Sequence, residues 1–408
     1  MTKLTNLKHL SKQITLLKRS GKKIVFTIGA YDLIHCDHAK YLLEARLAGD
    51  VLVVGLESNR SRYDEKGWGH PLIDQRTRAE MLSYFSFVDF ICLVHRKHVL
   101  SVLKYVRPNV FYTTAQNWKS VIGHGEATYL ENTATKVIKV PRRLPYVATS
   151  TLVKNIADLK LKEIMEYFFG KIKIDLARGD YSLSTSLQHK SSVRSDILRF
   201  NANFSESLLG LFFVGRVIPK ATLQELGERL RAEGKKIVFT AGSYDLLHVG
   251  HARFLQKASS LGDVLIVGLP SNEQVRQSKG RGRPIVDEIS RASLLCHLRS
   301  VGYAVIFNDP TVLECLRLLK PDIFYTVAEE WNEGYKESLE YKTVKQYGGK
   351  VARVPRQAPY LSASAIIDKA AGIRIREVFK KLLEIANATN CFRDNDWKHS
   401  ESTDIEWS

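Results

Sequence analysis

The sequence predicts an α/β protein made of two tandem copies of one domain, each built on a parallel β-sheet covered by helices. Two observations carry this prediction. First, residues 21–38 (GKKIVFTIGAYDLIHCDH) return as residues 234–251 (GKKIVFTAGSYDLLHVGH), with thirteen of eighteen positions identical at an offset of 213. Second, short apolar runs alternate with stretches of helical periodicity in each copy, which is the pattern of a parallel sheet with both faces covered.

The repeat extends well beyond this segment. AGDVLVVGLESN (48–59) matches LGDVLIVGLPSN (261–272), and VPRRLPYVATS (140–150) matches VPRQAPYLSAS (354–364), the latter pair at an offset of 214. A colinear series of this kind indicates a duplicated domain. We therefore expect copy one at residues 9–168, a linker at 169–216, copy two at 217–388 and a flexible tail at 389–408.

The expected elements of copy two follow in order. KKIVFT (235–240) is β-branched and aromatic, which is typical of a buried strand, and HARFLQKASSLG (251–262) carries apolar residues at helical spacing and stops at a glycine. By the same criteria we expect further strands at 263–269, 303–307 and 322–327, and helices at 290–301 and 311–320.

The segment between the copies breaks this pattern. Residues 180–195 (DYSLSTSLQHKSSVRS) are rich in serine and polar residues, which is typical of a linker or mobile loop, whereas residues 205–215 are apolar and are expected to pack on a domain.

Composition bounds the class of protein. Hydrophobic residues make up 44% and charged residues 25% of the 408 residues, which excludes a mainly disordered chain. No apolar run approaches the ~20 residues of a membrane span, and the N-terminus lacks the apolar core of a secretory signal. The five cysteines are far apart and form no CxxC pair. A cytoplasmic protein with reduced thiols is therefore expected.

The net charge of +18 indicates either an anionic partner or a solvated basic surface. The basic residues are spread along the chain rather than gathered in one tail, which argues against a nucleic-acid partner.

The loop after the first strand of copy two, TAGSYDLLHVGH, holds the strongest chemical signal. His248 and His251 flank Gly250 where a helix is expected to begin, and Thr240 ends the preceding strand. Glycine permits close approach of a ligand, and the N–H groups and dipole of a helix N-terminus favour phosphate. Core or capping histidines, or a metal pair, are the alternatives; zinc usually needs three or four protein ligands.

This combination resembles the HxGH signature of the nucleotidylyltransferase superfamily, in its cytidylyltransferase-like branch. Residues 217–367 resemble the adenylyltransferase domain that activates heptose 1-phosphate with ATP, through YDLLHVGHARFL, KGRGRPI (279–285) and SASAII (362–367). The tandem layout is similar to ethanolamine-phosphate cytidylyltransferase. The resemblance implies two Rossmann-like (HUP-type) domains and transfer of AMP or CMP to a phosphorylated sugar or alcohol, with Mg²⁺ accompanying the nucleotide.

The same resemblance implies a role for each matching residue. His248, His251 and Lys279 would be catalytic, with Lys279 on a flexible loop, and Asp245 would orient the histidine loop. No residue is assigned to a metal. The nucleotide-binding set would be Thr240, Gly242, Asp245, Gly250, Arg283, Arg356, Ser362 and Ser364. The segments TAQNW (114–118) and VAEEW (327–331) depart from the family pattern, which leaves the choice between ATP and CTP open.

Copy one carries most of the equivalent residues. Asp37 stands where copy two has Gly250, and a carboxylate there would face the phosphates, with a repulsion of ~1 kcal/mol at ~4 Å in bulk water and ~4 kcal/mol at an effective dielectric of 20. Trp68, His70 and Ala148 replace Arg281, Arg283 and Ser362. We therefore expect copy one to be catalytically impaired, the alternative being a second active site. The equivalents are Thr27, His35, His38, Lys66, Arg142 and Ser150.

Two further classes remain in view. A non-catalytic nucleotide sensor built from two degenerate copies is the main alternative to an enzyme. Class I aminoacyl-tRNA synthetases carry a similar histidine motif, but no KMSKS-like loop follows, so a nucleic-acid substrate is not expected. The resemblance to the nucleotidylyltransferase family also implies pairing through this domain, so a pseudo-dimer of the two copies within the chain, or a homodimer, is expected.

Overall fold

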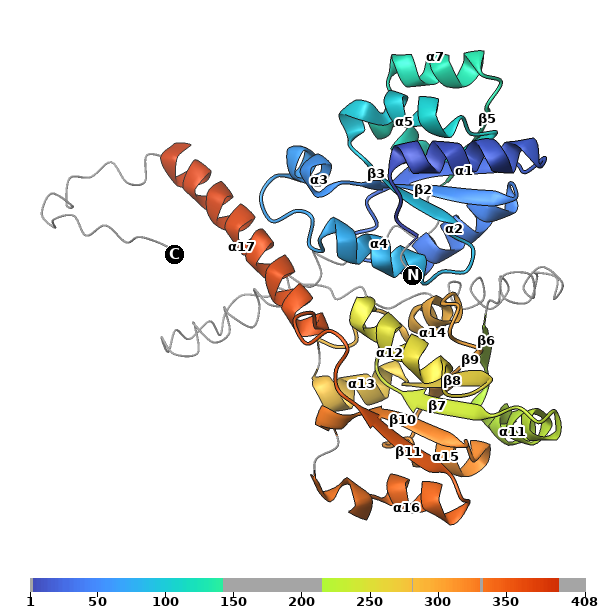
Figure 1. Ribbon diagram of the computed structural model, residues 1–408. Helices are drawn as coiled ribbons and strands as arrows, with labels where there is room; N and C mark the ends of the chain where they lie inside the picture. Colours follow the sequence, from blue (N-terminus) through green and yellow to red (C-terminus); the bar gives the residue numbers. More distant parts are fainter. Residues whose placement is uncertain (1–2, 142–214, 281, 331–332, 389–408) are drawn as a thin grey trace, which may run out of the picture.

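The computed structural model describes residues 3–141, 215–280, 282–330 and 333–388. Copy one forms a five-stranded parallel sheet in the order β3-β2-β1-β4-β5 (Figure 1). Every paired strand in it is parallel, with Ile24 beside Val51 and Val25 beside Val110 in the centre. The strands are β1 (Ile24–Gly29), β2 (Val51–Glu57), β3 (Phe90–Val94), β4 (Val110–Thr114) and β5 (Lys136–Val140).

Copy two repeats this sheet and adds one edge strand, in the order β11-β10-β7-β8-β9-β6. The added strand pairs Val217 with Ala304, and its counterpart in copy one is an isolated bridge between Leu4 and Ile91. The strands are β6 (Arg216–Ile218), β7 (Ile237–Ala241), β8 (Val264–Pro270), β9 (Tyr303–Phe307), β10 (Ile323–Val327) and β11 (Lys350–Val354). The predicted fold class, two tandem Rossmann-like parallel-sheet domains, is confirmed.

The helices lie on both faces of the sheets, as the alternation of elements predicted (Figure 1). Those of copy one are α1 (Leu7–Arg19), α2 (Cys36–Leu47), α3 (Asn59–Lys66), α4 (Gln75–Ser83), α5 (Val99–Val106), α6 (Ala115–Val121) and α7 (His124–Asn132). Those of copy two are α11 (Leu223–Ala232), α12 (Val249–Ser259), α13 (Asn272–Lys279), α14 (Glu288–Cys296), α15 (Leu313–Leu319), α16 (Leu339–Gln346) and α17 (Ala363–Ala388).

Two sequence-based expectations about these helices are wrong. Lys279, expected on a flexible loop, is the last residue of α13, because Ser271 caps the start of that helix and Gly280, at φ +93°, ends it. The helix expected at 290–301 covers Glu288–Cys296 only. The residues after it turn toward copy one instead of continuing the helix, and the Arg299 N–H donates to the carbonyl of Tyr84 at 3.0 Å.

The two copies pack against each other through equivalent elements. Helix α2 contacts α14, and α4 contacts α12, which is the same pair of elements with the copies exchanged. Phe85 bridges Leu298, its own counterpart at the offset of 213, so a pseudo-twofold axis passes near this point. One hydrophobic core runs through both copies and includes Leu82, Phe85, Phe87, Leu294 and Leu298. Within the described residues the two copies therefore pack face to face, and the expected pseudo-dimer or homodimer stays a prediction.

The remaining expectations about the chain are answered in part. No helix among the described residues combines the length and apolar character needed to span a membrane. Cys36, Cys92, Cys296 and Cys315 are buried free thiols. The linker at 180–195, the apolar segment up to residue 214, the tail from 389, and Cys391 lie outside the described residues. The domain boundaries themselves stay predictions.

Candidate active site

The candidate site of copy two forms where the sheet order changes direction. Strand β7 has β8 on one side and β10 on the other, and both of these strands come later in the chain. In open parallel sheets ligands bind at the carboxyl end of the strands at such a switch point. The loop from Gly242 to Leu247 leaves this end of β7 and leads directly to His248, the residue that caps α12.

The two histidines form a compact stacked pair at the start of α12. Their ring centroids are 3.9 Å apart with 28° between the planes. The Gly250 N–H donates to Nδ1 of His248 at 3.2 Å, and the His248 N–H faces Nδ1 of His251 at 3.4 Å. Because each Nδ1 accepts, the proton of each neutral ring resides on Nε2. The pair can therefore present N–H donors to an anion.

Burial and the neighbouring charges favour the neutral form of both rings. Burial lowers the pKa of His248 to about 4. Burial also holds the pKa of His251 well below its usual value, and the neighbouring His248, Lys279 and Arg356 lower it further. Two cations thus act on the ring of His251. Phosphate binding by Lys279 and Arg356 stays a prediction. A bound phosphate would reverse this balance and favour the protonated imidazole.

The two cations approach from different elements. Lys279, at the end of α13, donates from Nζ to the Ser243 hydroxyl at 2.7 Å, which places it over the histidine loop. Arg356 follows β11, and its backbone N–H donates to the Glu329 carboxylate at 3.1 Å. Glu329 belongs to VAEEW, the segment in which this chain departs from the family pattern.

Asp245 connects two loops of the candidate site, and the loop-orienting and nucleotide-binding roles expected of it stay predictions. Its buried carboxylate accepts the N–H groups of Ile285 and Val286 at 2.7 and 2.9 Å, so it joins the histidine loop to the loop after α13. Arg283 is engaged in an ion pair with the same carboxylate at 2.7 Å. The structure thus places Arg283 beside Asp245, and nucleotide binding by Arg283 stays a prediction.

Arg291 is a structural residue of the site to which the sequence assigned no role. Its guanidinium is buried and donates to the carbonyls of Ser243, Pro270 and Val286. A planar group with five donors can connect three loops in this way. Arg78 does the same in copy one, with the carbonyls of Ala30, Glu57 and Ile73.

Two glycines of the predicted set stand where space is short. A Cβ on Gly250 would lie 3.0 Å from the Cβ of Ala358 and 3.0 Å from the ring of His248. A Cβ on Gly242 would lie 3.1 Å from the ring of Tyr244, whose backbone has a left-handed φ of +45°. That ring meets His251 edge-on at 5.2 Å. The glycines therefore let the loop and residue 358 close around the histidines.

The other predicted residues are placed as follows. The Thr240 hydroxyl is fully buried and has no hydrogen-bond partner among the described residues, so no ligand reaches it in this conformation. The hydroxyl of Ser362 accepts the Ala365 N–H at 3.0 Å and thus caps α17, while Ser364 is exposed in its first turn. Phosphate binding by these three residues stays a prediction.

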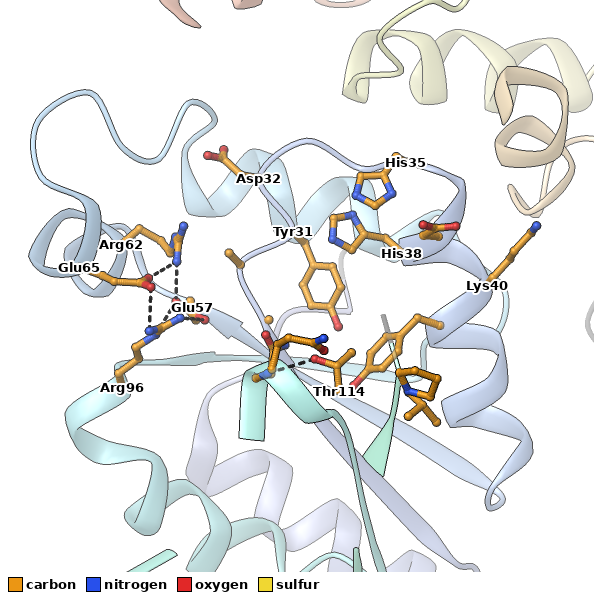
Figure 2. Close-up of a pocket in the computed structure, with 18 of the residues that line it drawn as sticks. Tyr31, Asp32, His35, His38, Lys40, Glu57, Arg62, Glu65, Arg96 and Thr114 are labelled. Atoms are coloured by element: carbon orange, nitrogen blue, oxygen red, sulfur yellow. Dashed lines mark hydrogen bonds and ion pairs between the residues drawn. The ribbon is translucent and has the colours of Figure 1, made fainter. Parts of the chain in front are cut away.

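Copy one contains the same pair of rings beside a well-defined pocket. His35 and His38 stack with centroids 3.8 Å apart, and Tyr31 meets His38 edge-on at 5.3 Å. Figure 2 shows these three rings pointing toward one another in the pocket. The pocket measures about 310 Å³ and is also lined by Asp37 and Lys66. Arg142 and Ser150, the expected phosphate ligands of copy one, lie outside the described residues, as does Ala148.

One wall of this pocket is an ion-pair cluster that copy two lacks. Glu57 binds Arg96 through two hydrogen bonds of 3.1 and 3.2 Å, Glu65 pairs with Arg96 at 2.9 Å, and Arg62 contacts both carboxylates (Figure 2). The equivalent positions of copy two hold Pro270, Val275, Ser278 and Asp309. These two arginines of copy one are therefore already neutralised by carboxylates.

Thr27 of the predicted set also differs from its counterpart. Its hydroxyl lies 2.6 Å from the Tyr41 hydroxyl, which in turn donates to the carbonyl of Tyr112 at 2.9 Å. Copy two has Phe254 in place of Tyr41, and the hydroxyl of Thr240 lacks this partner.

The described residues hold no cluster of three or more histidine, cysteine, aspartate or glutamate side chains arranged to bind a metal ion. Mg²⁺ as a companion of the nucleotide stays a prediction.

Comparisons with known proteins find relatives that match part of the chain. Two curated relatives, each called bifunctional protein HldE, are 46% identical over 127 residues (Geobacter metallireducens) and 44% identical over 147 residues (Helicobacter pylori strain G27). These matches cover 31% and 36% of this chain but only 25% and 30% of the relatives. A solved structure, the lipopolysaccharide core biosynthesis protein of Thermoplasma volcanium, matches 30% of this chain and 98% of its own, with 26% identity and a TM-score of 0.27.

The family comparison covers more of the chain. The model of the cytidylyltransferase-like family matches residues 26–182 and 239–369, which is one segment in each copy and more than half of the chain. Both segments contain the histidine loop at the carboxyl end of the central strand. The chain belongs to the cytidylyltransferase-like family.

Proposed function

We propose that the chain is a nucleotidylyltransferase whose active site lies at the start of α12 in copy two. A phosphate oxygen of a phosphorylated sugar or alcohol attacks the α-phosphorus of ATP or CTP. The new P–O bond forms as the bond from the α-phosphorus to the bridging oxygen breaks, and pyrophosphate leaves with that oxygen. The products are a nucleoside-diphosphate-linked compound and pyrophosphate, so atoms and charge balance without another reactant.

The observation that carries this proposal is the stacked pair His248 and His251 with two cations beside it. Phosphoryl transfer needs positioning and neutralisation of charge more than a protein nucleophile. The Nε2–H groups of the two rings and the N-terminus of α12 would stabilise the charge that grows on the α-phosphate, and Lys279 and Arg356 would balance the charge of the leaving pyrophosphate. Mg²⁺ would accompany the triphosphate.

The acceptor class rests on the resemblance of copy two to the adenylyltransferase domain that activates heptose 1-phosphate, together with the HldE relatives. A sugar 1-phosphate is therefore the first acceptor to test, with glycerol phosphate and ethanolamine phosphate as alternatives. Glu329 contacts Arg356 in the segment where the family pattern is broken, and it is a candidate for influencing the choice of base.

A pyrophosphate-release screen of the full chain tests this proposal. ATP and CTP are each combined with sugar 1-phosphates, glycerol phosphate and ethanolamine phosphate, with and without Mg²⁺. We expect release with one nucleotide and one acceptor class, and loss of release when Mg²⁺ is chelated. Nucleotide binding without turnover for any acceptor would instead favour the sensor, and absence of binding by either nucleotide would contradict both.

A further inference from the structure

Residues 355–362 form the segment of copy two that follows β11. Hydrogen bonds through Arg253 connect the middle of this segment to copy one. Arg253 of α12 contacts the Gln357 carbonyl at 3.3 Å and the Tyr360 hydroxyl at 3.1 Å. The same guanidinium forms two hydrogen bonds of 2.7 Å with Glu80, which belongs to α4 of copy one. A bidentate pair of this kind fixes orientation as well as distance. Glu80 therefore connects copy one to residues 357–360.

The same segment is held a second time through the helix that it starts. Helix α17 leaves the sheet of copy two and runs toward copy one (Figure 1). On that path Lys369 donates from Nζ to the Leu72 carbonyl at 2.7 Å, and Arg376 lies over the Trp68 ring at 4.5 Å. An apolar cluster joins Ile366, Ile367, Ala370 and Ile373 of α17 to Leu33, Leu72 and Ile73 of copy one.

Gly69 of copy one is the point of closest approach to α17. A Cβ on Gly69 would lie 2.4 Å from Cγ1 of Ile373, which no structure tolerates without movement. Gly67 has a similar φ, +78° against +83° for Gly69, but a Cβ there would meet nothing within 4 Å. The loop of copy one thus contacts α17 closely at Gly69 and has open space beside Gly67.

Residues 355–362 also contact the candidate active site. Ala358 is the neighbour that a Cβ on Gly250 would meet, so the segment lies on the first turn of α12. Arg356 acts electrostatically on His251. Any shift of α17 or of Arg253 would therefore move the arginine that the proposed function assigns to the phosphates.

We propose that copy one positions residues 355–362 of copy two, through Glu80 and through the loop 68–72, and so sets the nucleotide affinity of the site of copy two. Glu80 and Gly69 are positioning residues in this account and touch no substrate. The inference rests on the proposed function where it is tested by KM. It rests on the contacts alone where it is tested by hydrogen exchange. It gives copy one a role whether or not its own pocket binds a ligand.

The matched pair Gly69→Ala and Gly67→Ala in the full chain tests the proposal. Both variants place alanine at a left-handed φ in the loop after Lys66, and only Gly69→Ala collides with α17. We expect KM for the nucleotide to rise roughly tenfold in Gly69→Ala and less than about twofold in Gly67→Ala, because ~1 Å misplacement of a binding group costs up to ~100-fold. The kcat should change little in either variant.

Hydrogen exchange separates this inference from the proposed function. The N–H groups of Leu361, Ala365 and Ile366 are bonded within the segment and the first turn of α17, and they should exchange faster in Gly69→Ala than in Gly67→Ala. This readout needs no turnover. If the wild-type chain shows no nucleotide chemistry, the exchange result alone decides the inference. Equal exchange and equal KM in the two variants would overturn it.

A second pair covers the case in which Gly69→Ala fails to fold. Glu80→Gln removes the charge that orients Arg253 and should raise KM severalfold, whereas Glu80→Asp should restore part of the affinity because it keeps the carboxylate. Lys369→Ala should act in the same direction, with Lys380→Ala, an exposed lysine on the same helix, as its control. Unchanged KM and exchange in both Glu80→Gln and Lys369→Ala would contradict the proposal.

Discussion

The loop that ends in two stacked histidines occurs twice in this chain, and the two occurrences differ in what surrounds the rings. The pairs themselves are nearly identical, with centroids 3.8 Å apart in copy one and 3.9 Å apart in copy two. In copy two Gly250 donates to the first ring and admits residue 358 beside it. In copy one Asp37 occupies that position, and His35 makes no capping hydrogen bond to the helix.

The comparison shows that the backbone of the site can be retained while the polar side chains around it change. Copy one retains the strand order, the ring stack and the buried arginine, but adds Asp37, an ion-pair cluster and the Tyr41 hydroxyl. The Tyr41 hydroxyl, for example, bonds Thr27, whereas the equivalent Thr240 hydroxyl has no hydrogen-bond partner among the described residues. The contacts from copy one to α17 show in turn that an altered copy still contributes to the assembly.

Introducing the aspartate of copy one into copy two should give the largest effect on activity. Gly250→Asp puts the side chain of Asp37 into copy two, where its Cβ would meet Ala358 and its carboxylate would face the phosphates of the proposed substrate. We expect kcat/KM to fall by roughly a hundredfold or more, the scale at which preorganised electrostatic groups act in catalysis. Steady-state pyrophosphate release measures it. Activity within threefold of wild type would show that the residue between the rings is not what separates the copies.

The reciprocal change sharpens the comparison. In a chain silenced by His251→Ala, Asp37→Gly removes the carboxylate from copy one but leaves Tyr41 and the ion-pair cluster in place. We expect no recovery of turnover. Recovery would identify Asp37 as the sole block and copy one as a latent active site.

Acid should destabilise copy two through its buried imidazoles. The folded-state pKa values of His248 and His297 are about 4, lowered chiefly by burial, against an unfolded value of 6.5. Above pH 6.5 the two imidazoles are neutral in both the folded and the unfolded state, so their titration does not change the free energy of unfolding. As the pH falls from 6.5 toward 4 only the unfolded state takes up these protons, so each ring costs up to ~2 kcal/mol of stability at pH 5.

Urea unfolding at pH 7.5 and pH 5 measures this loss. His297→Phe removes one titrating ring at the interface between the copies and should reduce the pH dependence by about 2 kcal/mol. The same pH dependence in the variant and the wild type would show that His297 is not withdrawn from solvent as described.

The smallest expected effect concerns the hydroxyl pair of copy one. Tyr41→Phe leaves the fully buried Thr27 hydroxyl without its partner and should lower the free energy of unfolding by about 1–3 kcal/mol, measured by urea unfolding at pH 7.5. Phe254→Tyr is the matched change in copy two, where Thr240 would gain a partner, so stability should hold or rise. A loss in Phe254→Tyr as large as in Tyr41→Phe would point to packing rather than to the hydrogen bond.

Much of this account could be predicted from the sequence because the repeat fixes equivalent positions and the histidine loop is a local motif. The fold class and the family follow from residues that lie close together within each copy. The contacts of Arg253 and Lys369 with copy one join residues 173 and 297 positions apart, which no periodicity reveals. Lys279 was misplaced because α13 is short and polar, so its pattern resembles a loop.

The pair His251→Ala and His38→Ala in the full chain tests the central claim most directly. These residues are equivalent, and both rings stack on the preceding histidine. With the nucleotide and acceptor found in the screen, pyrophosphate release should fall by roughly a hundredfold or more in His251→Ala and stay within about threefold of wild type in His38→Ala. Equal losses, or a larger loss in His38→Ala, would contradict the assignment of the chemistry to copy two.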